Sequence, residues 1–493
     1  MTSLVHETDR STLNAVLSAA ANAAAPFADT APTVRARALR VVADVLDAAV
    51  DELVELAVAE TSLTRLRLSG EVARTTGQLR MFAAGLEEGS WFDAIIDTAD
   101  PQATPVPRPD LRRGQVGIGP VLVFAAGNFP FAFSVAGGDM ASALAAGCPV
   151  VLKAHPGHPR TSERTAVLVA EALADAGLPP GSFALIQGQQ AGVDVLRDPR
   201  ISAATFTGSL QGGRALFDIA TSREVPIPFF AEMGSLNPVF VTPGAVAARG
   251  QEIAESYVGS FTLGVGQFCT KPGLIFLPKG HGLTDALIEA MSGVAAGRML
   301  FDRIHTGHQH VRDTLLGHSG IEVLVQGDVD EGKVAATLLA TDVPTLLAAR
   351  ESLLTECFGP TSIIVEYDCD DEAVQGAAAF TGNLTGTIHA ESDDEALSGR
   401  LLNALRDRVG RLVWNGWPTG VAVCWAMQHG GPYPATTAPE HTSVGMTAMR
   451  RFLRPISYQN LPQQLLPESL RDRNVLGIPR RVNGRITTED VSW

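Results

Sequence analysis

Several features that mark whole classes of protein are missing from this sequence. It has no stretch of about 18 uninterrupted apolar residues, so a membrane-spanning helix is not expected. No apolar stretch follows a basic region near the start, so no secretory signal is expected. No run of lysine and arginine suggests a surface for nucleic acid. The sequence therefore favours a protein that works neither in a membrane nor on nucleic acid.

Cysteine is scarce and follows no pairing pattern. The chain has 5 cysteines at wide spacing, and none belongs to the CxxC pair of a structural zinc site. An odd and scattered set does not fit a disulfide framework, and it suits the reducing conditions of the cytoplasm. We therefore expect a cytoplasmic protein with free thiols and no metal site. The cysteines are Cys148, Cys269, Cys357, Cys369 and Cys424.

Positive charge is also in short supply. The chain has 38 Lys and Arg against 53 Asp and Glu, a formal net charge of −15. Such a protein can bind an anionic substrate only where a local group of arginine or lysine offsets the overall repulsion. Hydrophobic residues make up 45% of the chain and charged residues 18%, which predicts a globular protein with an ample core.

The spacing of apolar residues predicts two kinds of structure. Residues 1–90 carry apolar side chains at helical spacing. From residue 116 to 234, short apolar runs alternate with helical segments, which predicts a parallel sheet with right-handed crossovers. Ligands of such sheets bind at the carboxyl ends of the strands. The polar residues that closely follow a predicted strand are Asn128, Lys153, Ser209 and Glu232.

Cys269 has surroundings that do not suit a packing role. It lies in "FTLGVGQFCTKPG", residues 261–273, where glycines let backbone N–H groups and a substrate approach the sulfur. A thiolate is the nucleophilic form of cysteine, and it works best where its pKa is lowered or a base is close. A buried, inert cysteine is nevertheless the more common role for a single residue of this type.

Three other positions can each be explained by a structural role or by a role in catalysis or cofactor binding. Glu232, in "FFAEMGSLNP", ends an apolar strand, where desolvation would make it a general base or where it is simply solvated. Asn128, in "AAGNFPF", could stabilise an oxyanion or form a turn. In "TFTGSLQGG" a strand leads through Ser209 into a helix whose N-terminus can accept a phosphate, although the GxGxxG fingerprint is missing.

Together these motifs resemble the aldehyde dehydrogenase superfamily. The resemblance covers nearly the whole chain, since "GNFP", "VVLKAHP", "FTGS", "EMGSLNP", "GQFCTKPG" and "ECFGP" occur in the family's order. Two longer stretches, "FAFSVAGGDMASALAAGCPVVLKAHPGHPRTSE" and "RPISYQNLPQQLLP", look like the branch of α-ketoglutaric semialdehyde (2,5-dioxopentanoate) dehydrogenases.

The resemblance implies an α/β fold with a Rossmann-type parallel-sheet cofactor domain, an α/β catalytic domain and a small oligomerisation segment. Residues 1–98 and 119–234, with a return near 441–455, would form the cofactor domain, and 235–440 the catalytic domain. Residues 99–118 and 456–493 would be the oligomerisation segment and tail, in a homodimer or homotetramer. The pattern alone makes the proline-rich residues 101–113 an exposed connector or edge segment.

The resemblance also implies a mechanism for a small aldehyde substrate. Cys269 would attack the aldehyde carbon to give a thiohemiacetal, whose oxygen would sit against the Asn128 side chain and the Cys269 backbone N–H. Hydride would pass to the nicotinamide and leave a thioester. Glu232 would then activate the water that hydrolyses it.

Further positions are implied for the cofactor. Lys153 and Glu356 match those that hold the nicotinamide-side ribose hydroxyls, Phe358 the aromatic beside the nicotinamide ring, and Ser209 the residue that opens the helix under the pyrophosphate. In NAD-preferring members an acid three residues after the lysine repels a 2′-phosphate. That position is Pro156 here, and Arg214 could pair with the phosphate. We therefore expect NADP to be accepted and preferred, with NAD possible.

Two departures from the family pattern stand out. The family often has tryptophan before the oxyanion asparagine, and Gly127 in its place predicts a more open site. Cys357, between Glu356 and "FGP", is interpreted as a core substitution rather than a second nucleophile. The histidines of "HTGHQH" are not interpreted as metal ligands, because no acid or cysteine completes the set and the segment has the character of an exposed connection.

Other functions remain open at this stage. The substrate could be α-ketoglutaric semialdehyde, oxidised to 2-oxoglutarate, or a broad range of aldehydes including fatty ones, and Arg160, Arg450 and Arg451 are candidate carboxylate anchors. A CoA-acylating enzyme would not need Glu232. A catalytically silent scaffold would be expected to lose Cys269 or Glu232. A thiol hydrolase is disfavoured because no histidine lies in an obvious activating motif.

Overall fold

The computed structural model of the chain describes residues 7–330 and 332–492, and two of its N-terminal helices begin at polar caps. Helix α1 (Arg10–Ala28) begins after Asp9, whose carboxylate accepts hydrogen bonds from the N–H groups of Ser11 and Thr12. Helix α4 (Arg65–Glu88) begins after Thr64 and ends at Gly89 in the left-handed conformation. With α2 (Pro32–Ala48) and α3 (Val50–Thr61) they confirm the predicted helices from residue 7 onward, whereas residues 1–6 of that prediction lie outside the described residues.

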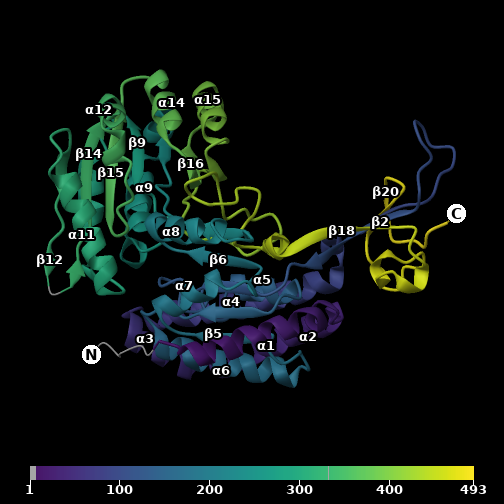
Figure 1. Cartoon of the computed structure of the whole chain (residues 1–493). Helices are drawn as coiled ribbons and strands as arrows, with labels where there is room; N and C mark the ends of the chain where they lie inside the picture. The colour runs from purple at the N-terminus through teal and green to yellow at the C-terminus, as the bar shows by residue number, and fades with distance from the viewer. Residues whose placement is uncertain (1–6, 331, 493) are drawn as a thin grey trace.

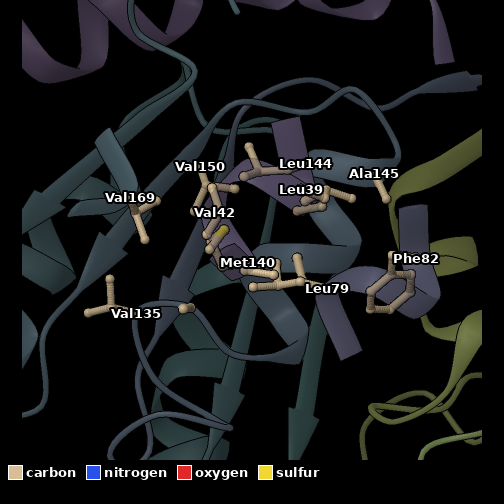
Figure 2. Close-up of a cluster of buried hydrophobic side chains, with 14 of the residues drawn as sticks. Leu39, Val42, Leu79, Phe82, Val135, Met140, Leu144, Ala145, Val150 and Val169 are labelled. Atoms are coloured by element: carbon tan, nitrogen blue, oxygen red, sulfur yellow. The ribbon is translucent and has the colours of Figure 1, made fainter. Parts of the chain in front are cut away.

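A five-stranded parallel sheet follows these helices, in the order β5-β4-β3-β6-β7. Its central strands are buried on both faces, which explains their continuous apolar sequences. One face packs against α2, α4, α5 and α6 in the core of Figure 2, and the other packs against α1, α7 and α8. The strands are β3 (Val121–Phe124), β4 (Val150–Lys153), β5 (Phe183–Ile186), β6 (Ala203–Thr207) and β7 (Phe229–Glu232).

A second sheet of seven strands lies above the first in Figure 1, in the order β11-β14-β15-β9-β8-β16-β17. All neighbours run parallel except β11 and β14. The strands are β8 (Val239–Val241), β9 (Leu274–Pro278), β11 (Glu322–Val325), β14 (Thr337–Asp342), β15 (Thr361–Tyr367), β16 (Asn383–His389) and β17 (Val409–Trp414). The predicted α/β class is confirmed.

Further helices cover the faces of the two sheets. Those of the first sheet are α5 (Gly138–Ala145), α6 (Pro159–Asp175), α7 (Gln189–Arg197) and α8 (Leu210–Thr221). Those that follow are α9 (Pro243–Thr262), α10 (Thr284–Ser292), α11 (Asp302–Leu316), α12 (Val343–Ala348), α13 (Arg350–Leu353), α14 (Asp370–Ala379) and α15 (Glu395–Leu405). Within residues 7–330 and 332–492, none of the helices is long and apolar enough to cross a membrane.

A third sheet projects away from the two main sheets (Figure 1), in the order β18-β2-β1-β19-β20. Strand β2 includes residues 111–113, which the sequence predicted to be a connector or an edge. That prediction is wrong for these residues, because β2 is paired on one side with β1 and along its whole length with β18. The strands are β1 (Ile95–Asp97), β2 (Leu111–Gly117), β18 (Leu453–Gln459), β19 (Arg480–Val482) and β20 (Arg485–Thr487).

A small three-stranded sheet and the histidine-rich segment complete the fold. The sheet has the order β10-β13-β12, from β10 (Gly297–Arg298), β12 (Val329–Asp330) and β13 (Lys333–Val334). The "HTGHQH" segment was predicted to be an exposed connection, and this is wrong because it lies inside α11. His308 is buried there, and its Nε2 lies 2.9 Å from Oγ1 of Thr361, so it is a core residue.

Candidate active site

Four of the predicted site residues lie at one edge of the first sheet. Asn128 follows β3, Lys153 ends β4, Ser209 follows β6 and Glu232 ends β7. The strands are parallel, so their carboxyl ends meet at this edge. Cys269 comes from the connection between α9 and β9 of the second sheet. The structure therefore builds the site where the two sheets meet.

The backbone before Cys269 follows an uncommon path. Gly264, Val265 and Gly266 have φ values of 58°, 61° and 65°, in the left-handed region. At Gly266 a side chain would also collide with the "FGP" loop, since a Cβ there would lie 2.3 Å from the carbonyl carbon of Gly359. The glycines next to Cys269 thus allow a tight turn and a close backbone approach.

Two buried side chains fix the segment that carries Cys269. Nδ2 of Asn237 donates hydrogen bonds to the carbonyl oxygens of Cys269 and Lys271, at 2.8 Å and 2.9 Å. Nζ of Lys271 donates to the carbonyl oxygens of Cys357 and Thr361, at 2.9 Å and 2.8 Å. These contacts hold the thiol rigidly, which a nucleophile needs if it is to meet its target at a defined angle.

The Cys269 thiol is half-buried and lies beside a histidine. Its Sγ is 3.5 Å from Nε2 of His429. Burial raises the pKa of this thiol well above its ordinary value, and the charge of Glu232 raises it further, while Arg74 opposes the shift. The resting site therefore holds Cys269 as a thiol, which must lose its proton to a neighbour before it can attack.

Glu232 is almost fully buried, at 3% exposure, and remains ionised. Burial alone would raise the pKa of its carboxyl, but the contacts with His429 and Ser443 outweigh burial and lower it. Oε2 accepts a hydrogen bond from Oγ of Ser443 at 2.5 Å, and Oε1 lies 3.1 Å from Nε2 of His429. That second contact lacks hydrogen-bond geometry, so Oε1 keeps a lone pair for another donor.

His429 is the main residue that sequence reasoning missed. Its backbone N–H donates to Oγ1 of Thr442 at 2.8 Å, and its ring lies 6.4 Å from the ring of Phe133. The sequence shows no histidine in an activating motif, and the structure nevertheless brings His429 next to the thiol of Cys269. The two residues are 160 positions apart in the chain, and no spacing or local motif connects "QHGG" with Cys269.

The same three side chains are also metal-ligand types. One ligand atom each from Glu232, Cys269 and His429 lies within 4.8 Å of the other two. Thiolate, imidazole and carboxylate are the donors that zinc binds in proteins. The cluster thus offers three zinc ligands, which the separate segments did not reveal in the sequence.

Two donors of the kind that stabilises an oxyanion lie on or beside the Cys269 loop. Nδ2 of Asn128 donates to the carbonyl oxygen of Gln267 at 3.2 Å, which places this amide beside the Cys269 loop. Within the described residues, no protein acceptor binds the backbone N–H of Cys269. The backbone oxygen of Asn128 accepts a hydrogen bond from Nη2 of Arg67 at 2.8 Å, which holds the asparagine loop in place.

The groups at the start of α8 and the end of β4 fit a dinucleotide. Ser209 caps α8, its Oγ accepting from the N–H of Gly212, and within the described residues the N–H groups of Leu210 and Gln211 have no protein acceptor. Nζ of Lys153 likewise makes no hydrogen bond or ion pair there, and burial lowers its pKa to about 8. Such free donors suit phosphate and ribose oxygens.

The other proposed cofactor residues lie nearby. Glu356 packs over Gly234, and burial raises the pKa of its carboxyl to about 7, although Lys271 opposes the shift. Phe358 is half-buried two residues further on. Pro156 is exposed after β4. Arg214 is exposed on α8, where its Nε binds Oδ1 of Asp218 at 2.9 Å.

Three smaller expectations can be checked against the structure. Gly127 was expected to open the site, and this is wrong because the ring of Phe301 occupies the space, 2.7 Å from where a Cβ would lie. Cys357 lies in the core of the second sheet, which confirms it as a core residue. Among the candidate anchors, Arg451 is buried and pairs with Asp139 at 2.8 Å, so it is not available to a substrate.

Comparison with known proteins identifies the family. The profile of the Aldehyde dehydrogenase family matches residues 2–437. The chain belongs to the aldehyde dehydrogenase family. It is therefore an enzyme that oxidises small aldehydes with NAD or NADP as the hydride acceptor.

Two bacterial relatives are similar over most of their length. The α-ketoglutaric semialdehyde dehydrogenase of Acinetobacter baylyi is 46% identical over 441 residues, 88% of this chain and 84% of the relative. The α-ketoglutaric semialdehyde dehydrogenase 2 of Azospirillum brasilense is 46% identical over 457 residues, 92% of this chain and 87% of the relative. The predicted branch resemblance is thereby confirmed.

Solved structures share the fold of this aldehyde dehydrogenase. Aldehyde dehydrogenase 21 of Physcomitrella patens, in complex with succinate, has a TM-score of 0.78 at 20% identity, with 92% of each chain covered. The NADP-dependent glyceraldehyde-3-phosphate dehydrogenase of Bacillus halodurans, in complex with NADP, has a TM-score of 0.77 at 20% identity, with 91% of each chain covered.

Proposed function

We propose that this aldehyde dehydrogenase oxidises α-ketoglutaric semialdehyde to 2-oxoglutarate. The single observation that carries the proposal is the 46% identity to relatives of that name over most of the chain. The geometry supports the chemistry, because a rigid thiol, a buried carboxylate and two oxyanion donors meet at one place. In the overall reaction the aldehyde, water and oxidised cofactor give the carboxylate, reduced cofactor and two protons.

In the first half of the reaction Cys269 acts as the nucleophile. His429, 3.5 Å from the thiol, accepts its proton, and the sulfur forms a bond to the aldehyde carbon. Asn128 and the backbone N–H of Cys269 stabilise the oxyanion of the thiohemiacetal. The bound cofactor supplies the hydride acceptor, and loss of hydride leaves a thioester on Cys269.

In the second half Glu232 acts as the general base. Its Oε1 has a free lone pair, and a small pocket lined by Glu232, His429 and Ser443 has a volume of about 20 Å³, enough for a water beside the carboxylate. The carboxylate takes a proton from that water, which attacks the thioester and releases the acid and the Cys269 thiol. This deacylating base is the feature that a CoA-acylating enzyme would not need.

We propose that NADP is preferred to NAD. Ser209 and the start of α8 would hold the pyrophosphate, Lys153 and Glu356 the hydroxyls of the ribose on the nicotinamide side, and Phe358 would lie beside the nicotinamide ring. Pro156 supports the preference, because no acid there repels a 2′-phosphate. To bind the phosphate, Arg214 would have to give up its ion pair with Asp218. Both side chains are exposed, so the loss of this ion pair costs little free energy.

We propose the following domains, assembly and location. Residues 1–98 and 119–234, with 441–455, form the cofactor domain, and 235–440 the catalytic domain. The projecting sheet supports a homodimer or homotetramer through residues 99–118 and 456–493, because β18 is a free edge that a second copy can extend. The free thiols support a cytoplasmic location.

The test is reduction of cofactor with α-ketoglutaric semialdehyde, glutaraldehyde and a medium-chain aldehyde, each with NADP and with NAD. We expect the highest kcat/KM for the semialdehyde with NADP, and no turnover by the Cys269→Ala variant. A preference for the medium-chain aldehyde would show that the enzyme acts on fatty aldehydes or on a broad range of aldehydes instead of the semialdehyde. No reduction with any pair would indicate a silent scaffold, and sedimentation as a monomer would contradict the assembly.

A further inference from the structure

An arginine that the mechanism does not use lies beside the nucleophile. The guanidinium of Arg74, on α4, lies over the ring of Phe133 at 5.3 Å and over the ring of Phe129 at 5.9 Å. Phe133 in turn neighbours His429, which contacts Cys269. Arg74 is half-buried, and within the described residues it makes no hydrogen bond or ion pair. Its donors therefore remain available to a ligand.

A second arginine lies seven residues earlier on the same helix. Arg67 lies over the ring of Phe268 at 4.8 Å and over Phe129 at 5.2 Å, and Phe268 is the residue before Cys269. Its Nη2 binds the backbone oxygen of Asn128, but its Nη1 is buried and has no hydrogen-bond partner. The rings of Phe129, Phe133 and Phe268 thus form an aromatic wall beside the thiol, and both guanidinium groups pack against it.

The carboxylate nearest to these arginines is already engaged. Glu71, between them on α4, accepts hydrogen bonds through Oε1 from the N–H groups of Phe131 and Ala132, at 2.8 Å and 3.0 Å. Burial raises the pKa of its carboxyl, while Arg67, Arg74 and the two backbone N–H groups oppose the shift. Two arginines against one such carboxylate leave a net positive charge at this wall.

Other charges face the same space. Arg74 is within electrostatic reach of Glu232 and Cys269, and Arg411 reaches Cys269 from β17. The acids that reach the same thiol are Glu232, whose Oε1 lies 3.1 Å from His429, and Glu356. The chain has a formal net charge of −15, yet three arginines lie near the one thiol of Cys269. Such a local group of positive charge is what an acidic protein needs to bind an anionic substrate.

We propose that Arg74, with support from the charge of Arg67, binds the carboxylate at the far end of the substrate while Cys269 attacks the aldehyde. This inference rests on the proposed function, because it says which residue binds the carboxylate end of that substrate, the end that does not react. The carboxylate and aldehyde carbons of 2,5-dioxopentanoate are four carbon–carbon bonds apart, roughly 5 Å when extended. Stacking on Phe133 leaves the edge of the Arg74 guanidinium free for a bidentate bond.

The first test compares substrates that differ in charge at the far end. We expect Arg74→Gln to lower kcat/KM for 2,5-dioxopentanoate about 10- to 100-fold, the loss typical of a hydrogen bond to a charged group. Pentanal has the same length and no carboxylate, and its kcat/KM should change less than about 3-fold. Arg80→Gln is the matched control, because Arg80 lies on the same helix and pairs with Asp44 and Asp47.

A second test does not depend on turnover. 5-Iodopentanoate and 5-iodopentanamide have the proposed length, and each alkylates the Cys269 thiolate by displacement of iodide. Mass spectrometry of the peptide that contains Cys269 gives the ratio of the two rates. We expect the ratio to favour the acid in the wild-type enzyme and in Arg80→Gln, and to fall about 10-fold or more in Arg74→Gln.

The outcomes separate this inference from the proposed function. Equal losses for 2,5-dioxopentanoate and pentanal in Arg74→Gln, or an unchanged alkylation ratio, would overturn the role of Arg74 and leave the substrate in place. A wild-type enzyme that prefers pentanal would overturn the substrate, and the alkylation ratio would then decide whether Arg74 binds anions.

Discussion

Replacement of His429 by phenylalanine should shift the pH dependence of this aldehyde dehydrogenase. The His429→Phe variant keeps a ring of similar size next to Phe133 but removes the nitrogen that lies 3.1 Å from Glu232 and 3.5 Å from Cys269. Glu232 would then have Ser443 and Cys269 to offset its burial. Because burial favours the neutral acid, the pKa of Glu232 should rise in the variant.

The size of the shift follows from the burial of the pair. His429 and Glu232 are 1% and 3% exposed, so solvent does not screen their interaction appreciably. A hydrogen bond or contact with a charged group in such a place contributes about 1.5–3 kcal/mol, which corresponds to about one to two pKa units. The native pKa of Glu232 is lowered, so the base is active down to acidic pH, and in the variant this activity is lost at a higher pH.

The assay is kcat for the semialdehyde from about pH 5 to about pH 9, because Glu232 acts after the thioester has formed and the acid limb of kcat reports the groups of the loaded enzyme. We expect the acid limb of His429→Phe to move up by about one to two units, and that of His429→Gln, which retains a donor, to move less. His310→Gln is the control, because His310 is exposed on α11. An acid limb in the same place for all variants would refute the reasoning.

Three other predictions concern the same site. Glu232→Gln removes a negative charge that raises the pKa of Cys269, so iodoacetamide should alkylate Cys269 faster at neutral pH, while steady-state turnover falls about 100-fold or more and the thioester accumulates as a burst. Pro156→Glu places an acid near the proposed 2′-phosphate, and the ratio of kcat/KM for NADP to that for NAD should fall about 10-fold or more. Zn²⁺ should bind Glu232, Cys269 and His429 and inhibit reversibly, with activity restored by EDTA, and Co²⁺ should give a visible thiolate band that Cys269→Ala lacks.

The fold was predictable wherever local pattern decides it. The apolar runs of β3 and β4 and the alternation with helices up to Glu232 sufficed for a parallel sheet. The strand at residues 111–117 was not predictable, because its partner β18 lies more than three hundred residues later in the chain. The proline-rich sequence that precedes it is also typical of a loop. The "HTGHQH" helix was missed for a related reason, since only the tertiary contact of His308 with Thr361 reveals its buried face.

The site shows the same division between local and distant information. Cys269, Glu232 and Asn128 were singled out because glycines, strand ends and turns surround them in the sequence. His429 has no such local mark, since it becomes significant only through contacts with residues far away in the chain. Arg74 was missed too, because the sequence shows it only as one of several arginines on a helix. Its position against Phe133, beside the thiol, is visible only in the structure.

The charge balance of the site leads to a last prediction about substrate binding. Burial raises the pKa of Glu356 to about 7, and its charge in turn raises the pKa of Cys269. Below that pH Glu356 is largely neutral and the cations of Arg67 and Arg74 dominate near the thiol, whereas above it a new negative charge opposes an anionic substrate. We therefore expect KM for 2,5-dioxopentanoate to rise about 3-fold as the pH passes through about 7, less so at high salt, and KM for pentanal to stay constant. Glu356→Gln should abolish the rise, and the same rise with pentanal would show that charge at the far end of the substrate is not its cause.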